Sequence, residues 1–175
     1  AGLGNGGSFR LDNGATLINQ GNFAIVDDVF VLQNASGTAS TFNNQGVLTL
    51  NVAGGVAGFG SNTGVALNFN NAGSVQAQAG TLRFDFGGTH SGSFDVANGA
   101  TIQFQGNHSF SNSSQINGAG TYVLSGGNRI FNGAWNHTGN LTTVGGFTAI
   151  DTFNTTTPIN VNAFQGGNTF VINTP

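Results

Sequence analysis

The chain has 175 residues, and only 5% of them are charged: three arginines and six aspartates give a net charge of −3, without lysine, glutamate or cysteine. So few cations cannot form the basic surface that neutralises nucleic-acid phosphates, and the lack of cysteine excludes disulfides and thiolate metal sites. No apolar run approaches the roughly 20 residues of a membrane-spanning helix, so membrane insertion is not expected. The length fits one domain over residues 1–175, and 16 phenylalanines favour an ordered core over disorder.

The first recognisable segment is GSFRLDNGATLINQGN at residues 7–22. It returns as GSFDVANGATIQFQGN at residues 92–107, with ten of sixteen positions identical. Apolar residues alternate on both sides of an Asn-Gly pair, a pattern typical of short strands joined at a tight corner. Internal repeats indicate stacked units, because a single unit of this size cannot bury its own apolar side chains.

The middle of the chain repeats with a period of 20. A threonine followed by alternating apolar residues occurs at Thr81, Thr101 and Thr121, and a weaker copy begins at Asn140. A strand-like segment precedes each copy and another follows it, so about 20 residues contain three short strands. The same template can be placed on Thr16 and Val47, with spacings that require insertions around residues 26–37 and 56–69.

Three short strands in each repeat predict one turn of a three-sided coil. The predicted fold is therefore all-β: a right-handed parallel β-helix with rungs of about 20 residues and insertions in the N-terminal half. Stacking would place two columns of side chains in the interior, Leu82 with Ile102 and Tyr122, and Phe84 with Phe104 and Leu124. An antiparallel sandwich with hairpins at the Asn-Gly pairs is the alternative, but it does not explain the period of 20.

Several of these repeats resemble those of a known class. The segments FNNQGVL at Phe42, FNNAGSV at Phe69 and INGAGTYVLSGGN at Ile116 are similar to repeats of bacterial surface β-helix proteins, the autotransporter-passenger and filamentous-haemagglutinin-like class. The resemblance covers residues 42–146 well, residues 7–22 through the opening repeat, and residues 147–175 poorly. It implies a β-helix at the cell surface or outside the cell. Such repeats occur in adhesins, fibres and enzyme scaffolds alike, so the resemblance does not select one function.

The candidate catalytic groups are six carboxylates. Hydrolysis by acid and base would need two of them to converge across a groove, and no calcium-binding spacing is present. Asp27 and Asp28 are adjacent, so their side chains should diverge, and Asp85 should pair with Arg83 on the outward face. We expect no catalytic residue, no cofactor and no metal site. The six carboxylates are Asp12, Asp27, Asp28, Asp85, Asp95 and Asp151.

Two histidines occupy corresponding places in successive repeats. His90 and His108 are expected to stack near Arg129, where two imidazoles could bind a metal or sense acid pH. A solvent-exposed ladder that simply follows the repeat is the favoured interpretation. His137, close to the only tryptophan, Trp135, does not suggest a cofactor site.

The last segment, residues 147–175, is less regular and is a candidate cap or subunit contact. The proposed contact residues are Ile159, Val161, Phe164, Phe170 and Ile172. Strand edges at the ends of a stack pair readily with other chains, and no lysine protects them here. We therefore expect a structural extracellular protein, a subunit or segment of a surface filament that binds copies of itself head to tail.

Two alternatives to the filament remain open. The first is an adhesin stalk or carbohydrate-binding module that contacts glycans or host surfaces through loops near Asp27 and Phe59. The second, less favoured, is a glycan-cleaving enzyme.

Overall fold

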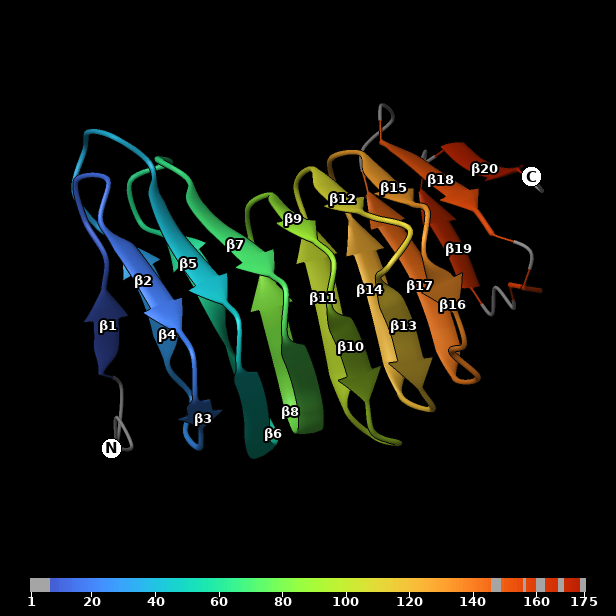
Figure 1. Cartoon of the computed structure of the whole chain (residues 1–175), viewed down its shortest axis with the longest axis horizontal. Helices are drawn as coiled ribbons and strands as arrows, with labels where there is room; N and C mark the ends of the chain where they lie inside the picture. The colour runs from blue at the N-terminus through green and yellow to red at the C-terminus, as the bar shows by residue number, and fades with distance from the viewer. Residues whose placement is uncertain (1–6, 146–148, 156, 160–162, 167–168, 174–175) are drawn as a thin grey trace.

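A computed structural model describes residues 7–145, 149–155, 157–159, 163–166 and 169–173. These residues form an all-β solenoid of about seven turns, with the chain advancing steadily from the N-terminal to the C-terminal end (Figure 1). Its twenty described strands lie in two sheets, of twelve and eight strands, and neighbouring strands run parallel. No described segment is a helix long and apolar enough to cross a membrane.

The solenoid has three faces, which we call A1, A2 and B. The larger sheet provides A1 and A2, because strands β6 and β8 are long enough to pass from one face to the other. Face A1 contains β3 (Asn22–Ile25), the first part of β6 (Val47–Ser61), the first part of β8 (Ser74–Phe84), β10 (Ser93–Val96), β13 (Gln115–Gly118) and β16 (Ala134–Trp135). Face A2 contains β1 (Ser8–Arg10), β4 (Phe30–Gln33), the ends of β6 and β8, β11 (Thr101–Gln105), β14 (Thr121–Ser125), β17 (Asn140–Gly145) and β19 (Ala163–Gly166). Face B is the smaller sheet and contains β2 (Thr16–Asn19), β5 (Ser40–Asn44), β7 (Leu67–Asn71), β9 (Gly88–His90), β12 (His108–Phe110), β15 (Arg129–Phe131), β18 (Ile150–Asn154) and β20 (Thr169–Asn173).

The period of 20 is the length of one turn in the middle of the solenoid. Thr101 pairs with Thr81 on one side and with Thr121 on the other. In the same strands Phe104 lies beside Phe84 and Leu124, and all three side chains are fully buried. The predicted interior columns are confirmed, and the antiparallel sandwich is wrong. Alternation of apolar and polar residues directs one set of side chains inward in every turn, and the stack buries that set continuously.

The two copies of the opening repeat lie on different faces. Strand β1 of the first copy pairs with β4 on A2, whereas β10 of the second copy pairs with β8 and β13 on A1. Both copies turn at the same glycine: Gly14 and Gly99 have φ values of 78° and 83°, where glycine avoids the strain that a side chain would cause. The first corner also has a positive φ of 57° at Asn13, which Asn98 does not share. The repeat therefore encodes a strand, a corner and a second strand, and it does not specify a face.

The placement of the repeat template on Thr16 and Val47 is wrong. Thr16 begins β2 on face B, Val47 begins β6 on A1, and Thr81 lies in the part of β8 on A2. The segments predicted as insertions contain strand β4 and the end of β6, which both belong to the stack. The error arose because alternation identifies a strand and its inward side, and all three faces share that pattern.

The N-terminal turns are longer, as predicted. Phe30 pairs with Gly58, 28 residues further along the chain. Part of the extra length is a bulge in β6. The segment from Asn51 to Val56 in β6 lies opposite the shorter segment from Ala79 to Thr81 in β8. A bulge of this kind adds residues to one strand without interrupting the sheet.

Candidate functional site

The predicted contact segment continues the stack. Strands β19 and β20 pair with β17 and β18, which extends faces A2 and B by one more strand each. Ile159 and Phe170 are half-buried against the core, and the Phe170 ring lies 4.6 Å from that of Phe153. Ile172 is 54% exposed. Val161 and the side chain of Phe164 lie outside the described residues.

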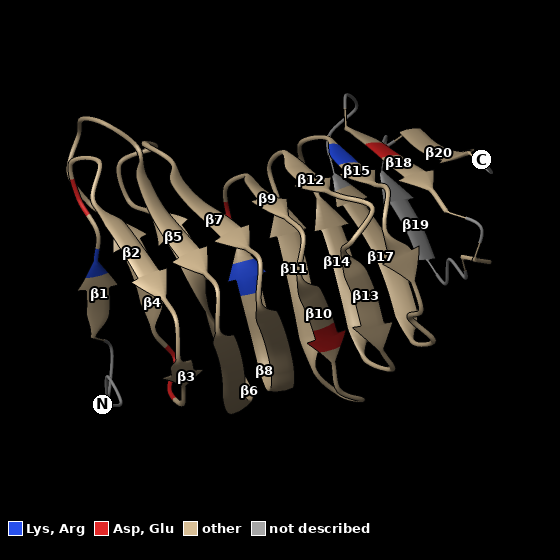
Figure 2. Cartoon of the chain, in the orientation of Figure 1, with Lys and Arg blue, Asp and Glu red and all other residues tan. Residues whose placement is uncertain are grey.

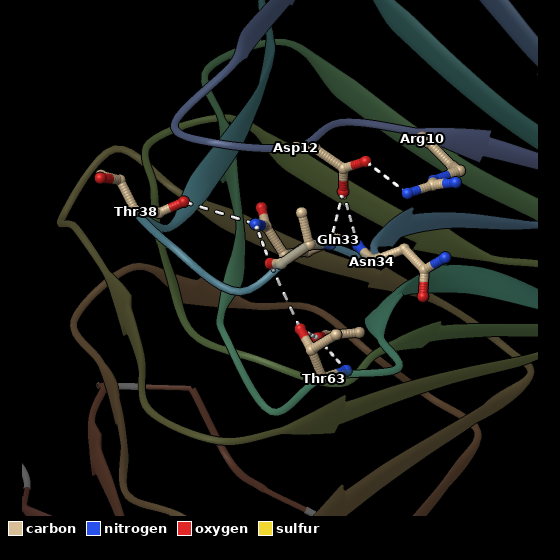
Figure 3. A network of polar contacts seen from close by, with 8 residues as sticks. Arg10, Asp12, Gln33, Asn34, Thr38 and Thr63 are labelled. Carbon is tan, nitrogen blue, oxygen red and sulfur yellow. Dashed lines mark hydrogen bonds and ion pairs between the residues drawn. The ribbon is translucent and has the colours of Figure 1, made fainter.

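Asp12 holds a loop of the next turn. Its carboxylate accepts hydrogen bonds from the backbone N–H groups of Asn34 at 2.6 Å and Ala35 at 3.0 Å, and it pairs with Arg10 at 2.8 Å (Figure 3). These bonds, that from Asn34 foremost, lower the pKa of the Asp12 carboxyl below its usual value. On the other side of this loop the Gln33 side chain donates to the Ala35 carbonyl at 3.0 Å. The network fixes the connection between β4 and β5.

Other carboxylates also bind neighbouring turns or side chains. Asp28 accepts a hydrogen bond from the Val56 N–H at 2.9 Å and so anchors the end of the β6 bulge. The predicted Arg83–Asp85 pair is present, with a separation of 2.8 Å. Asp12, Asp28 and Asp85 thus have structural partners, and the absence of a catalytic site stays a prediction.

The exposed ladder predicted for the histidines is wrong, because both side chains are buried. His90 and His108 are each 2% exposed, their rings stack with centroids 5.2 Å apart, and His90 Nε2 lies 2.9 Å from His108 Nδ1. His108 Nε2 lies 2.8 Å from the Gln105 carbonyl oxygen, which can only accept a hydrogen bond. His108 therefore carries its proton on Nε2, and His90 Nε2–H donates to the free Nδ1 of His108.

A buried ion pair lies in the two turns after the histidines. His108 pairs in register with Arg129, and Arg129 pairs with Asp151. Arg129 Nε donates to Asp151 Oδ1 at 2.5 Å, and both side chains are fully buried. The Arg129 Nη1 group also donates to the Gly126 carbonyl, which closes the end of the preceding strand. The two histidines, Arg129 and Asp151 thus form a buried polar chain along the inner side of face B.

The sequence contains a signal for this buried row of polar side chains. In strands β12, β15 and β18 the polar residue stands two positions before a phenylalanine, and residues two apart in a strand point to the same side. Since these phenylalanines are buried, the polar residues had to point inward as well. The three pairs are His108 with Phe110, Arg129 with Phe131, and Asp151 with Phe153.

The buried histidines predict a loss of stability in acid. Burial lowers the pKa of His108 to about 4, with a further contribution from the Arg129 charge, and burial lowers the pKa of His90 well below 6.5. Because the unfolded chain takes up these protons first, the free energy of unfolding should fall as pH drops from 6.5 towards 4. His108 alone should account for about 3 kcal/mol across this window, at 1.36 kcal/mol for each pKa unit.

Urea unfolding followed between pH 7.5 and pH 4 measures this loss. The double variant His90→Gln/His108→Gln, which cannot titrate at these positions, should show a much flatter profile between pH 6.5 and 4. A profile as steep as that of the unmodified chain would contradict the assignment.

The outer side of face B carries a shallow groove of about 750 Å³. It crosses strands β7, β9, β12 and β15, and therefore runs along the solenoid axis over successive turns. Its residues are mainly asparagine, glycine, serine and threonine, together with two apolar side chains. The lining comprises Asn68, Asn70, Phe86, Gly87, Gly88, Thr89, Gly106, Asn107, His108, Ser109, Asn128 and Ile130.

Sequence reasoning missed the groove. The loops near Asp27 and Phe59 were the predicted ligand contacts, but neither residue lines it, and Phe59 is fully buried. Comparisons with protein-family models, curated proteins and solved structures found no match.

Proposed function

We propose that this chain is a structural β-solenoid of the cell surface or extracellular space, and that it joins copies of itself head to tail into a filament. The observation that carries this proposal is the continuous parallel pairing of strands along the stack. From β1 to β19 on A2 and from β2 to β20 on B, each described strand presents the same face and direction to the next. An added turn could therefore continue the same parallel pairing.

The edge at β20 has hydrogen-bonding groups available for such a turn. The Thr169 N–H donates to the Ala149 carbonyl at 2.8 Å, towards β18. Successive residues of a strand direct their amides to opposite sides, so the Phe170 and Ile172 amides face away from β18. Edges of this kind pair readily with another chain unless charge or proline prevents it. The low charge of the chain adds little repulsion between copies.

A proline at the edge tests the proposal. Ile172→Pro removes an amide that faces the free edge, and the side chain it replaces is mostly exposed. We expect light scattering and negative-stain microscopy to show filaments of the unmodified chain and shorter particles or monomers of this variant. Ile172→Val keeps the amide and should assemble normally. Thermal melting of both variants verifies that the remaining turns stay folded. An unmodified chain that stays monomeric at high concentration would refute the proposal.

A further inference from the structure

Glycine lines part of the groove on face B. Gly87 occupies the position that Asn107 and Asn128 occupy in the next two turns, and it places no side chain there. A Cβ atom on Gly88 would approach the Phe69 carbonyl oxygen to 1.8 Å, and one on Gly87 would approach the Asn107 carbonyl oxygen to 2.3 Å. Neither glycine therefore has room for a side chain, and Gly88 shares the inward-facing position of His108 in the next turn.

One side of the groove presents oriented amide donors. Asn107 Oδ1 accepts the Asn128 N–H at 2.8 Å, and Asn128 Oδ1 accepts the Ile150 N–H at 2.9 Å. Because a backbone N–H can only donate, each carboxamide must place its oxygen towards the next turn. The Nδ2 groups of both residues have no hydrogen-bond acceptor among the described residues. Two successive turns thus offer parallel N–H donors at the groove.

The opposite side is polar as well. Asn70 Oδ1 accepts hydrogen bonds from the Thr89 N–H at 3.0 Å and the Thr89 hydroxyl at 3.2 Å. Ser109 is exposed beside Thr89, with which it pairs in register. The Asn70 Nδ2 group donates to Asn43 Oδ1 at 3.0 Å, so the exposed Ser109 hydroxyl is the group on this side that can both donate to and accept from a ligand.

The groove combines these groups with apolar surface and has no charge. Phe86 is only half-buried, unlike the phenylalanines of the core, and Ile130 is 45% exposed. None of the lining residues is aspartate, glutamate, lysine or arginine, and Figure 2 shows no charged residue on β7, β9 or β12. The His108 side chain is buried on the inner side of face B, so it brings no charge to the groove.

We propose that this groove binds a neutral oligosaccharide, in an extended conformation along the solenoid axis. The apolar face of a sugar ring would pack on Phe86, and its hydroxyls would accept hydrogen bonds from the Nδ2 groups of Asn107 and Asn128. Sites for drug-sized ligands measure about 300–1,000 Å³, and a groove of about 750 Å³ falls within that range. Because no lining residue is a lysine or arginine, an anionic glycan would find no cation in the groove. We therefore expect the ligand to be neutral.

Isothermal titration with five neutral hexasaccharides tests the proposal: cellohexaose, chitohexaose, maltohexaose, mannohexaose and xylohexaose. Hexagalacturonate is the anionic comparison. At least one neutral hexasaccharide should bind, and more tightly than hexagalacturonate does. Phe86→Ala should weaken that binding about tenfold or more, which corresponds to about 1.4 kcal/mol.

A near-isosteric variant separates binding from folding. Asn107→Asp keeps the oxygen that accepts the Asn128 N–H but replaces the free amide donor with a second oxygen, so it should also weaken binding about tenfold. Asn117→Asp adds the same charge on β13 of face A1, outside the groove, and should bind as the unmodified chain does. The proposal is overturned if no neutral hexasaccharide binds, if hexagalacturonate binds more tightly, or if neither groove variant weakens binding. These readouts do not depend on filament assembly.

Discussion

Replacing Asp151 with alanine is expected to lower the free energy of unfolding by about 3–5 kcal/mol, the usual cost of leaving one member of a buried ion pair without its partner. Arg129 and Asp151 are both fully buried, and Arg129 Nε lies 2.5 Å from Asp151 Oδ1. Arginine does not lose its proton in proteins, so the variant must retain an uncompensated cation in the core. Carbonyl oxygens of Phe104 and Gly126 accept from the guanidinium but cannot neutralise it. Urea unfolding at pH 7.5 measures the change.

A partly exposed ion pair of the same chain is the matched control. Arg83 and Asp85 are 2.8 Å apart, but their side chains are 33% and 21% exposed. Asp85→Ala should therefore change the free energy of unfolding by less than about 1 kcal/mol. The double variant Arg129→Met/Asp151→Leu should be more stable than Asp151→Ala, because it removes both charges and refills the space. Equal losses for Asp151→Ala and Asp85→Ala would show that Arg129 is not held as described.

Replacing Phe104 with alanine should cost about 3–5 kcal/mol in the free energy of unfolding, the range for truncating a buried phenylalanine. The ring is fully buried and stacks on Phe84 at 5.4 Å, with Phe94 and Phe110 at 5.2 Å. Because the neighbouring turns hold these rings in place through the sheet, the space left by the truncation cannot close fully.

The adjacent residue provides the control. Gln103 points away from the core and donates one hydrogen bond to the Ser125 hydroxyl at 2.9 Å. Gln103→Ala should cost no more than about 1 kcal/mol, the typical net contribution of such a bond. Chemical unfolding of the two variants side by side tests the register of β11, and similar losses would contradict it.

The sequence by itself determined the strands, their inward sides and their corners. These features are local: alternation over three to five residues sets which side chains are buried, as in β11 between Thr101 and Gln105, and glycine sets the corner at Gly99. Three consecutive copies at a period of 20 also indicated how those strands stack. The same local rule, applied to β12, β15 and β18, would have placed His108, Arg129 and Asp151 inside.

Only the tertiary structure decided which face each strand joins. The two opening repeats share ten residues yet lie on different faces, because the lengths of the loops and bulges between them set the position around the coil. The groove also depends on how the turns are stacked. Its donors, Asn107 and Asn128, are held by backbone groups of the next turn, about 20 residues further along the chain, and its lining residues come from four successive turns. Contacts between turns depend on the register of the whole stack, which no short stretch of sequence contains.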